Sequence, residues 1–181
     1  VTVLDENNDL AKKPAVWFGG RKYTPSDKGI IALPFSNQPG NQQIVLTDGD
    51  FETLENLAIP SENYALEAGF YVDREALIPG NLADLVVRPS ITVNGYPVPV
   101  SILEEVKLTI RSTDLDGIES VEEVPGFELK NDVESIHKFR VPGRVINLNF
   151  ILEAKVTAMS GSGSKDTLVA TDSVLLNTID Q

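Results

Sequence analysis

The sequence contains no cysteine and only one histidine, His137. The absence of cysteine excludes disulfide frameworks, cysteine-ligated zinc, iron–sulfur clusters and thiol nucleophiles. One histidine cannot supply a two-histidine metal site within one chain. A Ser-His-Asp triad would have to use His137, and no Gly-x-Ser-x-Gly elbow accompanies it. Because His137 lies on the same side of an alternating run as Phe139 and Val141, we expect it in a strand, at a sandwich edge or partly in the core. No catalytic residue is assigned.

Positive charge is also scarce. Lys and Arg number 15 against 27 Asp and Glu, which gives a net charge of −12. Such a chain is repelled by phosphate backbones, so we expect no nucleic-acid partner. The apolar runs are short and interrupted, which predicts no membrane insertion. The chain begins with Val1 and shows no signal peptide, and we expect a processed form or a segment of a longer protein.

What the sequence does contain is turn residues at intervals of roughly 8–15 residues, with β-branched and aromatic runs between them. The clearest run is 145–158, where apolar residues occupy every second position. This pattern predicts one long strand with a bend or bulge. The turn at 161–164 then predicts a C-terminal hairpin with a second strand over 167–178.

Helix signals are few. Asp50 precedes two acidic residues and is a good N-cap, so residues 50–57 are predicted to form two helical turns. Residues 101–108 are ambiguous, because Ser101 and Glu104 fit a capping box whereas the residues that follow favour a strand. A polar segment with Pro60 predicts a domain boundary that divides the chain into 1–62 and 63–181.

The first of these parts resembles the transthyretin-like or carboxypeptidase-regulatory-like β-sandwich. The resemblance lies in the order of strand, polar turn, strand, Thr-x-x-x-Gly turn and strand, carried by 1–7, 13–18, 23–24 and 27–34. The second part is similar to a macroglobulin-type sandwich domain in residues 77–88 and 139–142. The thioester of that family requires a cysteine, so covalent trapping is not implied.

Pattern and resemblance together predict an all-β fold of two packed antiparallel β-sandwich units, immunoglobulin-like or transthyretin-like, with little helix. The resemblance further implies a segment of a large secreted or cell-surface protein. We therefore expect a non-catalytic structural or binding module that presents loops and sheet faces to a protein partner or to other domains of its parent chain.

One loop suggests a metal. Asp114, Asp116 and Glu119 surround Gly117, and calcium prefers several oxygen ligands from one loop. The loop lacks the full EF-hand pattern, and a β-turn that uses Asp and Gly for its backbone is the competing interpretation. Calcium is therefore predicted as a ligand that the fold does not require. The acidic segments 5–9 and 48–52 are poorer candidates.

Two alternatives to a protein-contact module follow from the same residues. The first is a calcium-stabilised or carbohydrate-binding module, because exposed aromatic rings stack on sugars. Its candidate platform is Trp17, Tyr23, Tyr64, Tyr71 and Tyr96, although core packing is the default for such residues. The second is a carboxylate-dependent hydrolase, for which no Asp-Thr-Gly or Asp-Ser-Gly motif is present.

Overall fold

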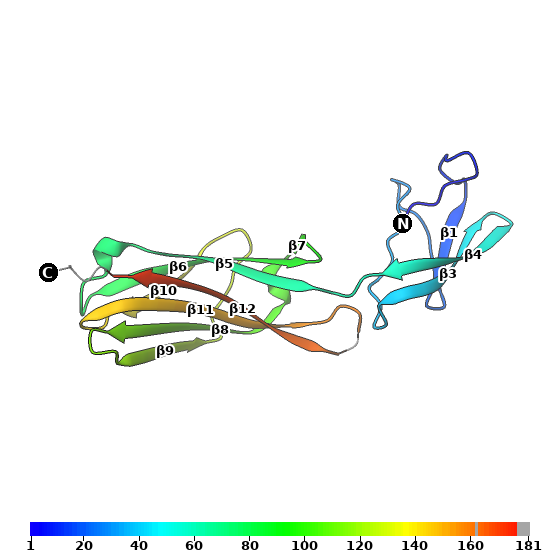
Figure 1. The fold of residues 1–181 in the computed structure, drawn as a ribbon. Helices are drawn as coiled ribbons and strands as arrows, with labels where there is room; N and C mark the ends of the chain where they lie inside the picture. Colours follow the sequence, from blue (N-terminus) through cyan, green and yellow to red (C-terminus); the bar gives the residue numbers. More distant parts are fainter. Residues whose placement is uncertain (162, 177–181) are drawn as a thin grey trace. The chain divides into compact units, whose positions relative to one another are not determined.

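The computed structural model describes residues 1–161 and 163–176, in which all strand pairs are antiparallel and helix is confined to two short 3₁₀ turns (Figure 1). The all-β prediction with little helix is confirmed. No helix of the described residues is long and apolar enough to cross a membrane. The chain divides into two compact units. The first contains residues 1–62 and the turn that begins at Met159, and the second contains residues 63–158 and the last strand.

The first unit contains a four-stranded sheet in the order β2-β1-β3-β4. Its strands are β1 (Pro14–Phe18), β2 (Arg21–Tyr23), β3 (Gly40–Asp48) and β4 (Phe51–Ile59). Extended segments cover one face of this sheet. Val1 and Ile31 exchange two backbone hydrogen bonds of 2.8 Å. The buried cluster joins sheet and segments through Val3, Val16, Phe18, Ile31, Ile44 and Ile59.

The helix predicted over residues 50–57 is wrong, because this segment lies in strand β4. All nine residues of β4 pair with β3, from Asp48 opposite Phe51 to Gly40 opposite Ile59. Gly49 makes the turn with φ of +64°. An isolated two-turn helix is marginal in water, whereas this pairing satisfies the backbone and brings Leu57 and Ile59 onto the core. Tertiary pairing therefore outweighs the N-cap signal.

The second unit is a sandwich of two sheets. One has the order β10-β6-β5, with β7 also paired to β6, and the other has the order β12-β11-β8-β9. The elements of the first sheet and its connections are β5 (Tyr64–Val72), η1 (Arg74–Ala76), β6 (Leu82–Val93), β7 (Tyr96–Val98), η2 (Val100–Ile102) and β10 (Ser135–Arg140). The second sheet contains β8 (Leu103–Asp114), β9 (Glu119–Pro125), β11 (Val145–Thr157) and β12 (Lys165–Leu175).

Aromatic rings fill the space between the two sheets. The Phe150 ring of β11 stacks on Phe70 of β5 at 5.9 Å between centroids, and it meets Phe139 of β10 edge-on at 6.3 Å. Burial along β11 alternates from Leu148 to Val156, as the sequence pattern predicts. The expected irregularity of this strand is confirmed, since its register with β8 shifts at two places.

The predicted C-terminal hairpin is confirmed over the described residues. Strands β11 and β12 pair from Thr157 opposite Lys165 to Asn147 opposite Leu175. The predicted second strand extended to residue 178, and residues 177 and 178 lie outside the described part of the chain. The ambiguous segment 101–108 forms the end of η2 followed by β8, so its strand character prevails from Leu103 onward.

Candidate functional site

The loop predicted to bind calcium connects β8 to β9. The Asp114 carboxylate lies back over the turn and accepts hydrogen bonds from the backbone N–H groups of Asp116 at 2.9 Å and Ile118 at 2.8 Å. Asp116 binds the Arg144 guanidinium through both carboxylate oxygens, at 2.6 and 3.3 Å. The carboxylates of Asp114 and Asp116 therefore already have partners within the protein.

Glu119 begins strand β9, opposite Thr113 of β8. In residues 1–161 and 163–176 no group of three or more His, Cys, Asp or Glu side chains is arranged to hold a metal ion. Calcium at Asp114, Asp116 and Glu119 stays a prediction. A calcium ion would compete with Arg144 for Asp116.

His137 lies in β10, at the edge of its sheet, with a side chain that is 20% exposed. One ring nitrogen, Nε2, lies 2.9 Å from Glu122 Oε1 of β9. Strand β9 is the edge of the other sheet, so this contact joins the two sheets along one side of the sandwich. The expected position at a sandwich edge is confirmed.

The five aromatic residues proposed as a sugar platform do not form one surface. Tyr64 is buried, while Tyr71 and Tyr96 are 66% and 74% exposed. Tyr64 and Tyr96 both pair with Val93, and Tyr71 lies at the other end of β5, about 20 Å away at the rise of a strand. Trp17 and Tyr23 belong to the first unit, where Lys22 lies 6.0 Å from the Trp17 ring centroid.

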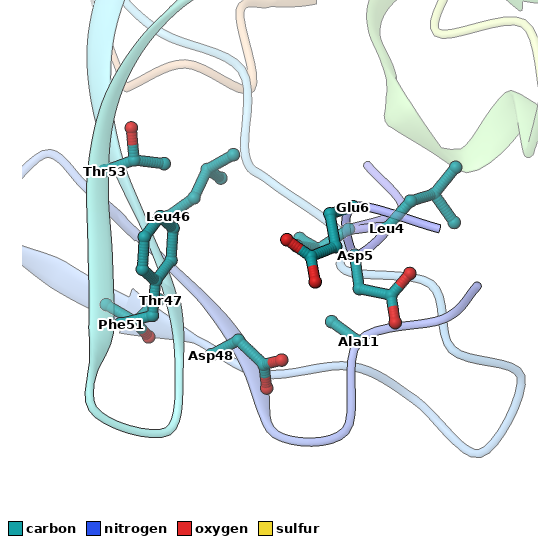
Figure 2. A pocket seen from close by; sticks show the side chains of 10 residues that line it. Leu4, Asp5, Glu6, Ala11, Leu46, Thr47, Asp48, Phe51 and Thr53 are labelled. Atoms are coloured by element: carbon teal, nitrogen blue, oxygen red, sulfur yellow. The ribbon is translucent and has the colours of Figure 1, made fainter. Parts of the chain in front are cut away.

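The first unit contains a cavity of about 320 Å³, here called the first-unit cavity (Figure 2). Its apolar part comes from both the sheet and the N-terminal segment. Three carboxylates complete its rim, those of Asp5, Glu6 and Asp48. The full lining is Val3, Leu4, Asp5, Glu6, Ala11, Leu46, Thr47, Asp48, Phe51 and Thr53.

Local backbone contacts hold these residues in place. Leu4 and Leu10 form an isolated antiparallel β-bridge, and the Ala11 N–H donates a hydrogen bond to the Val3 carbonyl at 3.1 Å. Asp5 Oδ1 accepts from the N–H groups of Asn7 and Asp9 at 2.8 and 3.0 Å. The sequence marked 5–9 and 48–52 as acidic, but no local signal indicated that they meet in space.

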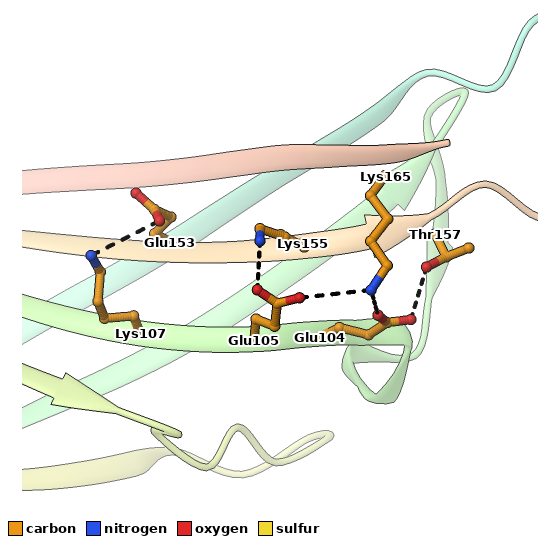
Figure 3. A network of polar contacts seen from close by, with 7 residues as sticks. All are labelled: Glu104, Glu105, Lys107, Glu153, Lys155, Thr157 and Lys165. Carbon is orange, nitrogen blue, oxygen red and sulfur yellow. Dashed lines mark hydrogen bonds and ion pairs between the residues drawn. The ribbon is translucent and has the colours of Figure 1, made fainter. Parts of the chain in front are cut away.

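A second charged arrangement lies across β8, β11 and β12 (Figure 3). Lys165 binds Glu104 at 2.6 Å and Glu105 at 3.7 Å, and Lys155 binds Glu105 at 2.5 Å. The Thr157 hydroxyl also donates to Glu104 at 2.9 Å. We call Glu104, Glu105, Lys155, Thr157 and Lys165 the β8–β12 network.

These partners change how the network titrates. Hydrogen bonds from Lys165 and then Thr157 lower the pKa of Glu104. The hydrogen bond and charge of Lys155 lower the pKa of Glu105. The hydrogen bond to Glu104 raises the pKa of Lys165. All three groups are exposed, so the network is a solvated surface and not a buried catalytic pair.

Two facing antiparallel sheets with an aromatic core define the second unit as an immunoglobulin-like β-sandwich domain. The model of the AbpF third immunoglobulin-like domain family matches residues 73–181, and the chain belongs to this family. The chain is also similar to Actin-binding protein F of Dictyostelium discoideum, with 29% identity over 188 residues. That match covers 100% of this chain and 8% of the length of the relative.

The comparisons correct the predicted location and support only part of the fold and function predictions. The predicted secreted or cell-surface location is wrong, because the relative is named for binding actin, a protein of the cell interior. The immunoglobulin-like part of the fold prediction is confirmed. The transthyretin-like and macroglobulin-like details receive no support, and neither do the carbohydrate-binding and hydrolase alternatives.

Proposed function

We propose that this chain is a non-catalytic protein-contact module within a longer actin-binding protein. The observation that carries the proposal is the family match over residues 73–181, together with similarity of the whole of this chain to 8% of the length of a protein named for binding actin. The polar groups of the described residues support it. The histidine binds a glutamate between two edge strands, and the acidic loop residue Asp116 binds Arg144. These contacts hold structure together and do not activate a nucleophile or water.

The partner is a protein, which is either actin or another domain of the parent chain. Because the chain spans 8% of its relative's length, contacts within a long parent chain are the second candidate. Both candidates use the same physical means. Loops and sheet faces on a rigid sandwich present side chains to a partner.

Sedimentation with actin filaments tests the proposal. We expect the 181-residue chain to pellet with filaments in a saturable manner. The pelleted fraction should change between 50 mM and 200 mM NaCl, because the chain has a net charge of −12 and salt screens interactions between exposed charges. An unrelated β-sandwich of similar charge serves as the control.

A second measurement separates the two candidates. Cross-linking of the parent protein reports whether this segment contacts neighbouring domains. A chain that stays in the supernatant but cross-links to its neighbours supports the second candidate. If the chain neither pellets with filaments nor cross-links to neighbouring domains, the protein-contact role is refuted.

A further inference from the structure

The first-unit cavity combines an exposed ring with an apolar floor. Phe51 begins edge strand β4 and is 67% exposed. Leu46 pairs with Thr53 and Asp48 pairs with Phe51, so β3 and β4 supply one wall. Figure 2 shows the Phe51 ring on one side of the opening and the carboxylates of Asp5 and Glu6 on the other, with the Asp48 carboxylate at the end of β3 next to Phe51. A ring of this size left open to water at a cavity mouth favours contact with a partner.

The rim of the cavity carries one sign of charge. Asp5, Glu6 and Asp48 line it, and no lysine or arginine among the described residues does. Within residues 1–161 and 163–176, none of these three carboxylates is in an ion pair. Lys12 and Lys13 lie in the adjoining loop, where the Lys13 backbone N–H donates to Asp48 Oδ1 at 2.6 Å.

The two properties together select the occupant. An arginine or lysine side chain has an alkyl stem that packs on apolar surface and a cationic head that meets carboxylates. Its head also interacts favourably with an aromatic face. We propose that the first-unit cavity binds an arginine or lysine side chain of a protein partner, with the stem against Leu46 and Phe51 and the head at the carboxylate rim. This proposal rests on the protein-contact function above and names the chemistry of one contact.

Other occupants fit the cavity less well. A bare metal ion makes no use of the apolar wall, and the three carboxylates are not grouped as metal ligands. An uncharged apolar side chain gives the rim carboxylates no cation to bind. Another open apolar surface, around Tyr71, Val86 and Ile136 of the second unit, has both Arg88 and Glu134 in its lining and therefore no preference for one sign of charge.

Peptide titration followed by nuclear magnetic resonance tests the proposal on the whole chain. The probe is the pentapeptide acetyl-Gly-Leu-Arg-Leu-Gly-amide, and the matched peptide has norleucine in place of arginine. We expect the arginine peptide to shift the amides of residues 3–11 and 46–53, with an affinity several-fold above that of the norleucine peptide. The difference should shrink between 30 and 300 mM NaCl, since exposed charges are screened.

Three variants sharpen the result. Within residues 1–161 and 163–176 the Glu6 side chain makes no hydrogen bond, so Glu6→Gln removes only its charge. Phe51→Ala removes an exposed ring, and neither change should impair folding. Each variant should lower the affinity for the arginine peptide by about threefold, which is the size of effect expected from one exposed charged contact. Glu55→Gln lies on the same strand outside the cavity and should leave affinity unchanged.

The proposal is overturned if the two peptides bind equally, if the shifts map elsewhere, or if Glu55→Gln weakens binding as much as Glu6→Gln. It is also overturned if millimolar calcium produces the same shifts and displaces the peptide. Actin sedimentation of Glu6→Gln separates this inference from the function above. If the chain pellets as before but does not bind the peptide, only the cavity proposal is refuted. If it binds the peptide but contacts neither actin nor neighbouring domains, only the proposed function is refuted.

Discussion

Single carboxylates in this protein serve mainly as backbone acceptors and ion-pair partners. The Asp114 carboxylate accepts hydrogen bonds from two backbone N–H groups of its own turn, and the Asp5 carboxylate does the same in the N-terminal loop. Short acidic side chains favour such turns because they replace a backbone acceptor. An Asp-x-Asp-Gly sequence therefore predicts a turn at least as well as it predicts a calcium site.

The calcium prediction can be tested at this scale by thermal melting. If Asp114, Asp116 and Glu119 bind calcium, an excess of one hundredfold over the dissociation constant stabilises the fold by about 2.7 kcal/mol. The expected result is a higher Tm with calcium that EDTA reverses and Asp116→Ala abolishes.

Arg144 provides the internal control for that melt. It holds Asp116 and has φ of +56°, a conformation that asparagine tolerates better than most residues. Arg144→Asn frees Asp116 and should strengthen the calcium response. An equal Tm with calcium and with EDTA in both proteins would leave these acids as turn and ion-pair residues.

At the scale of elements, a β-bulge explains the position of the β8–β12 network. The register between β8 and β11 shifts between Lys155 opposite Glu104 and Glu153 opposite Lys107, which inserts one extra residue into β8. Glu105 has φ of +50° there. A bulge re-aims side chains, and Glu104 and Glu105 consequently both face solvent within reach of Lys165.

The stability of the second unit should respond to acid through this network. The folded pKa of Glu104 and of Glu105 lies below the ordinary 4.5, so their contribution is full above that pH and is lost as pH falls through the lowered pKa. Lys165 has a pKa raised above 10.5, so its contribution is full below 10.5 and is lost as pH rises through the raised pKa. The network is complete between these limits.

Urea unfolding from pH 7 to pH 2.5 measures the acid limb. The double variant Glu104→Gln/Glu105→Gln should lose less stability on acidification than the wild type. Glu128→Gln, an exposed residue outside the network, should follow the wild type. Parallel pH profiles for wild type and double variant would contradict the assignment.

On the scale of the whole molecule, the chain has two compact units, each with its own buried residues. Val16 is fully buried in the first unit and Leu152 in the second. We propose that the two units are separate cooperative folding units, since chains of more than one domain commonly depart from two-state unfolding. Native-state hydrogen exchange resolves such units.

Leu152→Ala should destabilise the second unit by about 2–5 kcal/mol and speed exchange in β5 to β12. Val16→Ala should speed exchange in β1 to β4. Each variant should leave the protected amides of the other unit unchanged. Equal acceleration throughout the chain by either variant would show one cooperative unit instead.

Much of the second unit can be predicted from local pattern. Strand β11 alternates because residues on one face of a strand meet the core at every second position. The segment 50–57 shows the limit of such reasoning, since its cap signal competes with pairing to β3 that no local pattern reveals. The Arg144–Asp116 contact is likewise invisible to local pattern, because the two residues lie 28 positions apart in the chain.

Composition and period-two alternation are local properties, and they are enough to predict the all-β class, the acidic charge, the long C-terminal hairpin and the absence of cysteine chemistry. The three-dimensional fold was needed to show that Asp5, Glu6, Asp48 and Phe51 line one cavity, and that Glu104 and Glu105 contact the same lysine. These juxtapositions depend on strand pairing and on a bulge, which form between residues far apart in the chain.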